Sequence, residues 1–165
     1  MKKLNEGQVE FLEEVCGLAK KLVTDYGLDW RLMAAAAILE SGWGESVLAR
    51  ESRNYFGIRA LPGDGKDKVY ALKRGDGFER FRKYASMEES FRAYGRLLSR
   101  SRYYAAAREA RDGVLMERDV RDRMLEVFVA QMAPVYCPGD PDYGLKIMQL
   151  VEMVERVALV DGKAR

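Results

Sequence analysis

Apolar residues recur along the first part of the chain at the spacing of one face of a helix. From about Asn5 to Tyr26 this face carries Val9, Leu12, Val15, Ala19, Leu22, Val23 and Tyr26. Gly27 is placed to end this helix, and Asp29 is placed to cap the next one. The second helix contains the run LMAAAAILE and ends at the two glycines of SGWG. A shorter helix is expected near Glu45 to Arg53.

The middle of the chain, from Asn54 to Tyr84, is rich in glycine and changes its pattern. The segments VYALKR and FERFRKY flank a Gly-Asp-Gly turn, which predicts a β-hairpin. Ser86 and Glu89 then have the spacing of a capping box. They predict the start of a helix whose apolar residues are Met87, Phe91, Tyr94, Leu97 and Leu98.

The last third of the chain is predicted to be helical again. One helix is expected from Tyr103 to Ala110 and another from Asp119 to Met132, with Val120, Met124, Val127 and Phe128 facing inward. Pro134 and Pro138 predict a loop before a final helix from about Pro141 to Leu159. The order of helices, one hairpin and then more helices predicts an α+β fold that forms a single domain over residues 1–165. A ligand cleft is expected between the helical lobe and the hairpin lobe.

Composition narrows the possible chemistry. The chain has 165 residues, the size of one domain, and its net charge of +2 argues against a dedicated nucleic-acid binder. It has no histidine, which excludes Ser/His/Asp and Cys/His catalytic arrangements and every zinc site that needs imidazole. Acid–base catalysis would therefore depend on Asp, Glu, Lys, Tyr or Cys.

The cysteines, Cys16 and Cys137, are too few for a disulfide framework or a four-cysteine metal site, and no metal or organic cofactor is predicted. Cys16 is in register with the apolar face of the first helix, whereas Cys137 lies in a Pro/Gly loop; whether they are bridged stays open. No apolar run reaches the roughly 18 residues of a membrane span. The N-terminal segment lacks the uninterrupted apolar stretch of a secretory signal.

Glu40 is the strongest candidate for chemistry. It follows Ala36 by four residues and Met33 by seven, so it shares a helix face with apolar side chains. Partial burial and the negative end of the helix dipole would both raise the pKa of its carboxyl, as a proton donor at neutral pH requires. The alternative is a solvated glutamate at a helix end.

Several segments, in order, resemble glycoside hydrolase family 73, the peptidoglycan N-acetylglucosaminidases. They are Glu40-Ser41-Gly42-Trp43-Gly44, Asn54-Tyr55-Phe56-Gly57-Ile58-Arg59, Phe81-Arg82-Lys83-Tyr84, Leu97-Leu98 with Arg102-Tyr103, and Tyr136 with Asp140-Pro141-x-Tyr143. The resemblance covers about residues 9–159. It implies a lysozyme-like fold, mostly helical with a small hairpin lobe beside the catalytic cleft.

The resemblance also implies roles for individual residues. Glu40 matches the catalytic general acid, and Tyr136 matches a tyrosine near the scissile bond, with a core tyrosine as its alternative. The implied substrate-binding set is Ser41, Trp43, Asn54, Phe56 and Tyr84. Trp43 and Phe56 would stack on sugars or pack in the core, Asn54 would bind the acetamido group or a turn backbone, and Tyr84, like Tyr143, has a structural alternative.

The sequence departs from the family at the second carboxylate. Lys73 stands where many members have a glutamate on the first hairpin strand, and Cys137-Pro138-Gly139 makes the tyrosine loop one residue longer. Glu79 on the returning strand, or Asp76 at the turn, could replace the missing carboxylate, and both also suit solvated hairpin charges. Two routes stay open: a water positioned by Tyr136 and a hairpin group, or attack by the substrate's own acetamido oxygen.

The resemblance therefore implies an enzyme that cleaves the β-1,4 bond between N-acetylglucosamine and N-acetylmuramic acid. Its partner would be the glycan strands of peptidoglycan, and we expect a monomer without nucleic-acid binding or membrane insertion. The alternatives are a muramidase or lytic transglycosylase of the same fold, or a glycan-binding or assembly module without turnover. The substrate lies at the cell wall, so we expect phage-lysin-like release or dedicated export.

Overall fold

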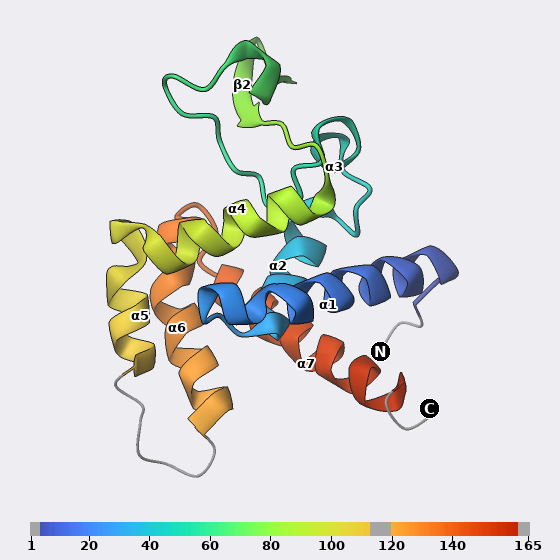
Figure 1. Ribbon diagram of the computed structural model, residues 1–165, viewed down its shortest axis with the longest axis vertical. Coiled ribbons are helices and arrows are strands. Elements are labelled where there is room, and N and C mark those ends of the chain that lie inside the picture. The colour runs from blue at the N-terminus through green and yellow to red at the C-terminus, as the bar shows by residue number, and fades with distance from the viewer. Residues whose placement is uncertain (1–3, 113–119, 162–165) are drawn as a thin grey trace.

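The computed structural model describes residues 4–112 and 120–161. Its helices are α1 (Glu6–Tyr26), α2 (Trp30–Ser41), α3 (Val47–Ser52), α4 (Met87–Arg100), α5 (Ala105–Asp112), α6 (Val120–Tyr136) and α7 (Tyr143–Asp161). Short 3₁₀ turns lie at Lys66–Lys68 and Arg102–Tyr104, and two strands, β1 (Val69–Arg74) and β2 (Gly77–Arg82), form the hairpin. Figure 1 shows the hairpin lobe standing on one side of a helical bundle, which confirms the predicted α+β arrangement.

Helix α2 is the centre of the bundle. It packs against both α1 and α7, and the run from Arg31 to Ile38 is buried throughout. The four alanines from Ala34 to Ala37 have no exposed surface, so their small side chains let neighbouring helices approach α2 closely. Asp29 caps its N-terminus, accepting a hydrogen bond from the backbone of Arg31, and Gly42 ends it in the left-handed conformation. Both predicted ends are confirmed.

Arg31 anchors the start of α2 by ion pairs with three carboxylates. Its side chain is only 3% exposed, and it lies 2.9 Å from Asp29, 2.7 Å from Asp122 on α6 and 3.0 Å from Glu155 on α7. A buried arginine must find such partners, because an unpaired buried charge would cost several kcal/mol. The first turn of α2 is thereby fixed against two helices that come much later in the chain.

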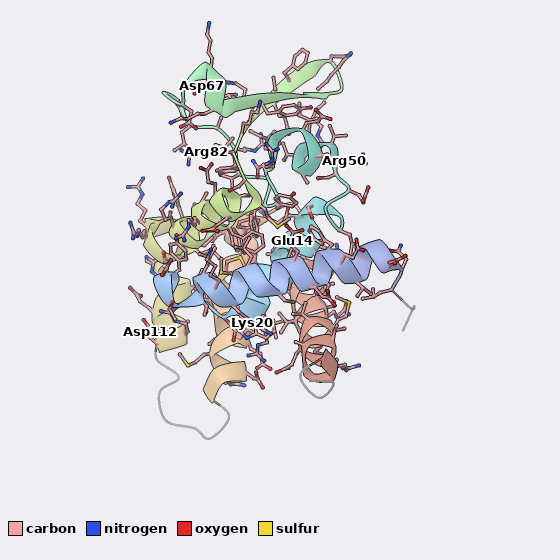
Figure 2. All side chains as sticks on the ribbon, turned by 45° about the vertical axis from the view of Figure 1, so that its right-hand side comes forward. Glu14, Lys20, Arg50, Asp67, Arg82 and Asp112 are labelled. Atoms are coloured by element: carbon pink, nitrogen blue, oxygen red, sulfur yellow. The ribbon has the colours of Figure 1, made fainter. Side chains whose placement is uncertain are left out.

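The hairpin is short and has the predicted turn. Arg74 pairs with Gly77, so Gly75 and Asp76 form a two-residue turn in which Gly75 has φ +56°. Backbone hydrogen bonds join the hairpin to the segment before it, from Arg82 N to Ile58 O and from Ala60 N to Arg80 O. Figure 2 shows Arg82 where this lobe meets the helices.

Asn54 braces the loop between α3 and the hairpin. Its side-chain amide donates to the carbonyls of Ile58 (2.8 Å) and Arg82 (2.9 Å), and its oxygen accepts from the backbone of Ile58 (3.0 Å) and Phe56 (3.4 Å). Asn54 is also almost completely buried. Of the two interpretations of this residue, the turn-stabilising one is therefore correct.

Several predicted details of the helices are wrong. Val9 is 37% exposed and does not join the core face of α1. Helix α6 continues through Pro134 to its end at Tyr136, two residues later, and the missing N–H of the proline removes a single hydrogen bond. The inward face of α6 is Leu125, Phe128, Val129, Met132 and Ala133. Of the three predicted inward residues whose side chains are described, Phe128 is fully buried, and Met124 and Val127 are half-buried. The predicted start at Asp119 and the side chain of Val120 lie outside the described residues.

Two other element starts differ from expectation. Ser86 accepts a hydrogen bond from Glu89 N at 3.1 Å, but the Glu89 carboxylate accepts from Ala85 N rather than from Ser86. Only half of the predicted capping box therefore forms. Helix α7 begins at Tyr143 rather than near Pro141, because Asp140 O accepts from Tyr143 N in a turn at this point.

The structure also answers whether the cysteines are bridged and whether a described helix could cross a membrane. Cys16 is buried in the core, as predicted, and Cys137 is half-buried after α6; no disulfide joins them. Within residues 4–112 and 120–161, no helix has the length and apolar character that crossing a membrane requires.

The hydrogen bonds of Asn54 generate a stability prediction. Asn54→Ala leaves buried backbone groups of the loop without partners, so it should lower the free energy of unfolding by about 2–4 kcal/mol. Urea denaturation followed by circular dichroism measures the loss. As the control, Asn5→Ala removes only an exposed helix cap and should cost about 1 kcal/mol. A smaller loss for Asn54→Ala than for Asn5→Ala would contradict the proposed brace.

Candidate active site

A cleft of about 700 Å³ lies between the helical bundle and the hairpin lobe, at the C-terminal end of α2. The loop after Asn54, one face of α4, the turn at Tyr103–Tyr104 and the end of α6 contribute its walls. Its lining residues are Glu40, Phe56, Gly57, Ile58, Arg59, Leu61, Arg82, Ala93, Arg96, Leu97, Arg100, Tyr103, Tyr104, Tyr136 and Cys137. A second groove, of about 790 Å³, lies between α1, α2 and α7 and includes Trp43, but not Glu40.

Glu40 projects from the last turn of α2 into the cleft. Burial raises the pKa of its carboxyl above the ordinary value of 4.5, and the negative charge of Asp140 acts in the same direction. The hydroxyl of Tyr143 acts in the opposite direction, since it stabilises the charged form, but burial outweighs it. The site therefore favours a protonated carboxyl, held on the most buried helix of the bundle.

Aromatic rings from α4, α6 and α7 lie beside this carboxyl. The ring of Tyr136 stacks against Tyr143, with centroids 5.7 Å apart, and meets Tyr94 edge-on at 5.7 Å. The buried hydroxyl of Tyr143 is near enough to affect the charge of Glu40, yet it has no hydrogen bond of normal geometry. These rings exclude water from one side of Glu40, which accounts for the desolvation of its carboxyl.

Tyr136 also holds the loop that covers Glu40. Its hydroxyl donates a hydrogen bond to the carbonyl of Phe56. The next residue, Gly57, has φ +64°, and a Cβ there would lie 3.7 Å from Glu40 Oε2. The loop therefore passes directly beside the carboxyl. Tyr136 lines the same cleft as Glu40, as the resemblance implied, but the proton of its hydroxyl is already used by the protein.

Three predicted substrate-binding residues are buried in the structure. The hydroxyl of Ser41 donates to Ala37 O at 2.6 Å and accepts from Gly44 N at 2.7 Å, inside the core. The ring of Phe56 is 1% exposed and stacks on Tyr94 with centroids 4.1 Å apart, so no sugar can reach it. Asn54 is the buried brace described above. Ser41 and Asn54 support the cleft from behind, and Phe56 belongs to the cleft lining although its ring is buried.

Three other candidates lie outside the cleft lining. Trp43 is half-buried in the second groove, and Tyr84 is half-buried with burial raising the pKa of its phenol to about 12. Glu79 lies on β2, where it forms an ion pair with Arg59 at 3.2 Å. Arg59 lines the cleft and Glu79 does not, so Glu79 reaches the site only through its partner.

The structure adds residues to which the sequence assigned no role in the site; Tyr103 was named only as part of a motif of the resemblance. Tyr103 lines the cleft with 65% of its surface exposed, and the guanidinium of Arg102 lies over its ring at 5.3 Å. Arg96 and Arg100 line it from α4. The sequence does show that the two arginines share one helix face with Ala93 and Leu97, because of their spacing. No sequence pattern shows that this face lines a cleft.

Comparisons with known proteins agree with this architecture. Among solved structures, the glycoside hydrolase domain from Salmonella typhimurium FlgJ superposes with a TM-score of 0.71 at 24% identity, covering 95% of this chain and 94% of that one. The peptidoglycan hydrolase from Sphingomonas sp. A1 gives 0.69 at 25% identity, covering 92% and 93%. These similarities confirm the fold that the resemblance implied.

Sequence relatives point to the same group. Peptidoglycan hydrolase FlgJ of Pseudomonas aeruginosa is 26% identical over 159 residues, which cover 88% of this chain and 36% of FlgJ. Exo-glucosaminidase LytG of Bacillus subtilis is 30% identical over 157 residues, covering 90% of this chain and 52% of LytG. The chain thus spans between a third and about half of the length of these curated relatives.

The match to a family model covers most of the chain. Residues 16–156 match the glucosaminidase family, described as mannosyl-glycoprotein endo-beta-N-acetylglucosaminidase. This range includes Glu40, the loop that covers it and the tyrosines around it. The predicted family is confirmed, and the chain belongs to the glucosaminidase family of glycoside hydrolases.

Proposed function

We propose that this chain hydrolyses the β-1,4 glycosidic bond between N-acetylglucosamine and N-acetylmuramic acid in peptidoglycan, with Glu40 as the general acid. The observation that carries the proposal is the position of Glu40: among the described residues lining the cleft it is the one carboxylic acid, and burial raises its pKa. The substrate class follows from the family and from two relatives that are named for acting on peptidoglycan or as glucosaminidases.

Glu40 would donate its proton to the glycosidic oxygen as the bond breaks. A general acid must be protonated at the working pH, and desolvation of Glu40 raises its pKa in the direction that this requires. The rigid setting of α2 serves the same purpose, because a proton donor needs a fixed distance to the oxygen it protonates. No metal or organic cofactor enters this step.

For the nucleophile we propose the acetamido oxygen of the substrate. A positioned water would need a second carboxylate or an available hydroxyl close to Glu40. Glu79 is paired with Arg59 outside the lining, and the hydroxyl of Tyr136 donates to Phe56. Attack by the substrate's own acetamido group needs neither residue and is an established exception to the two-carboxylate arrangement.

Tyr103 is the proposed platform for a sugar ring. Its ring is the most exposed aromatic surface in the cleft, and amphipathic aromatics suit the apolar faces of carbohydrates. It takes the role that the sequence suggested for Trp43 and Phe56. We further propose that residues 1–165 form one glucosaminidase domain that acts as a monomer at the cell wall, the location of the substrate.

The same fold leaves alternatives to be tested. A muramidase or a lytic transglycosylase would use a carboxylic acid at the same position but would cleave the neighbouring glycosidic bond of the strand. The transglycosylase would leave a 1,6-anhydro end. A glycan-binding module would keep the cleft without turnover. The raised pKa of Glu40 favours an enzyme over a binding module, since binding alone would gain nothing from a destabilised carboxylate.

Glu40→Gln should abolish the reaction without harming the fold. Removing a general acid typically lowers turnover by about 10²–10⁴-fold, measured here as reducing ends released from purified peptidoglycan. Because the folded state holds the Glu40 proton more tightly than the unfolded state does, its charged form costs stability once the pH exceeds the folded pKa. Glu40→Gln should therefore raise the melting temperature at pH 8 relative to wild type, and should do so less at pH 4.

The matched control is Glu79→Gln, which removes the hairpin carboxylate that pairs with the cleft-lining Arg59. It should keep at least about half of the wild-type turnover, because it loses only an exposed ion pair. If Glu40→Gln keeps more than a tenth of the turnover, or if Glu79→Gln is as inactive as Glu40→Gln, the assignment of roles is wrong.

Tyr143→Phe should shift the pH profile. The Tyr143 hydroxyl lowers the pKa of Glu40, so removing it should raise that pKa further. Activity of a general acid falls as the pH rises through its pKa, and the falling limb of kcat/KM should therefore move to higher pH. Tyr84→Phe, which also removes a buried hydroxyl but does not line the cleft, should leave the limb in place. A shift to lower pH in Tyr143→Phe would contradict the proposed contact.

Product analysis tests which bond is cut and how. Digests should carry N-acetylglucosamine at the new reducing end, seen as glucosaminitol after borohydride reduction and mass spectrometry of the muropeptides. Participation of the acetamido group predicts retained anomeric configuration, which NMR of fresh product reports. Muramitol would indicate a muramidase, and 1,6-anhydro ends would indicate a lytic transglycosylase. An inverted anomeric configuration would indicate direct attack by water.

A further inference from the structure

The wall of the cleft carries positive charge that the proposed chemical step does not use. Its charged lining residues are one acid and four arginines: Glu40, Arg59, Arg82, Arg96 and Arg100. Two of the arginines are neutralised by nearby acids. Arg59 pairs with Glu79 at 3.2 Å. Arg82 makes two hydrogen bonds to the carboxylate of Asp64, which hold the pKa of that carboxyl below its usual range.

Arg96 and Arg100 differ from this pattern. Both are exposed side chains of α4, one helical turn apart, and neither lies within ion-pair distance of a carboxylate in the part of the chain that the structure describes. Like charges at this spacing repel each other and destabilise a helix slightly. Arg100 gains something from the helix C-terminus, but Arg96, a full turn earlier, gains little.

The face of α4 that bears this pair is turned to the cleft. Ala93, Arg96, Leu97 and Arg100 have the spacing of one helix face, and all of them line the cleft. The short side chains of Ala93 and Leu97 leave the two guanidinium groups as the most prominent features of this wall. Tyr103, the proposed sugar platform, lies in the 3₁₀ turn that follows α4 and lines the same cleft.

We propose that Arg96 and Arg100 bind a carboxylate of the peptide stem carried by the glycan strand, and so make this cleft prefer stem-bearing peptidoglycan over bare glycan. The inference rests on the proposed function, which supplies a strand lying along the cleft. Arginine is suited to the task, because its planar guanidinium binds a carboxylate through two parallel hydrogen bonds. An anion between the pair would also remove their mutual repulsion.

The substrate offers carboxylates from two sources. In intact strands the lactyl group of N-acetylmuramic acid is joined to the stem through an amide, so the available anions are the carboxylates of the stem itself. When an amidase removes the stem, the lactyl carboxylate becomes free. A neutral chito-oligosaccharide has neither. These three ligands separate recognition of the stem from recognition of the sugar chain.

Binding can be measured without turnover in the Glu40→Gln background, by titrating three probes: soluble stem-bearing strands, amidase-treated strands and chitohexaose. Adding Arg96→Gln and Arg100→Gln should weaken binding of stem-bearing strands about tenfold and of chitohexaose less than twofold. Raising the salt concentration should weaken binding of stem-bearing strands to the parent protein and have little effect on the double variant. Arg96→Lys with Arg100→Lys keeps the charge and should restore part of the loss.

The matched control is Arg50→Gln with Arg123→Gln, which removes two exposed arginines that do not line the cleft and leaves binding unchanged; Figure 2 shows Arg50 on α3. No loss in the cleft variant, or an equal loss for chitohexaose, would overturn the proposal. An equal loss for amidase-treated strands would overturn the assignment to the stem in favour of the lactyl carboxylate. If wild type released no reducing ends from peptidoglycan, the proposed function would be refuted. The proposed role of Arg96 and Arg100 would not, because the binding titrations do not depend on turnover.

Discussion

The architecture depends on the complete burial of α2. This helix ends at Glu40 and Ser41, and the packing that buries its alanines fixes the direction in which the last turn points. A flexible or exposed helix could not hold a carboxyl against aromatic rings, because the carboxyl would rotate into water and regain its ordinary pKa. Arg31 at the other end of α2, with its three carboxylate partners, stops the helix from sliding between α6 and α7.

A second set of interactions places the loop after α3 beside this fixed carboxyl and so forms one wall of the cleft. Asn54 folds the loop after α3, the hydroxyl of Tyr136 holds the carbonyl of Phe56, and Gly57 lets the backbone turn beside Glu40. The side chains of Asn54 and Tyr136 thus bind the protein's own backbone. What remains open to a substrate is the opposite wall, formed by α4 and Tyr103, whose exposed side chains are aromatic and basic.

The sequence predicted elements and the acid better than it predicted the contacts of the site. Periodicity located α1 and α4 because each has one apolar face, whereas α2 was located by its apolar run and its end signals. Glu40 was conspicuous because a carboxylate beside apolar residues on a helix is rare. Phe56 and Trp43 were ambiguous for a physical reason: core packing and sugar stacking favour the same aromatic residues. Arg96 and Arg100 look like an ordinary solvated face until the hairpin lobe is placed opposite them, and Pro134 shows that a proline near a helix end does not always end it.

The central claim is that the fold keeps the Glu40 carboxyl protonated at pH values where an ordinary glutamate is charged. Carbon-13 NMR of protein labelled at the glutamate side-chain carboxyls, with Glu40→Gln to identify the Glu40 signal, measures this pKa directly. The account predicts a pKa clearly above the ordinary glutamate value of 4.5, in line with the burial of this group. A value at or below the ordinary one would contradict it, because the carboxyl would then be a solvated charge and not a proton donor.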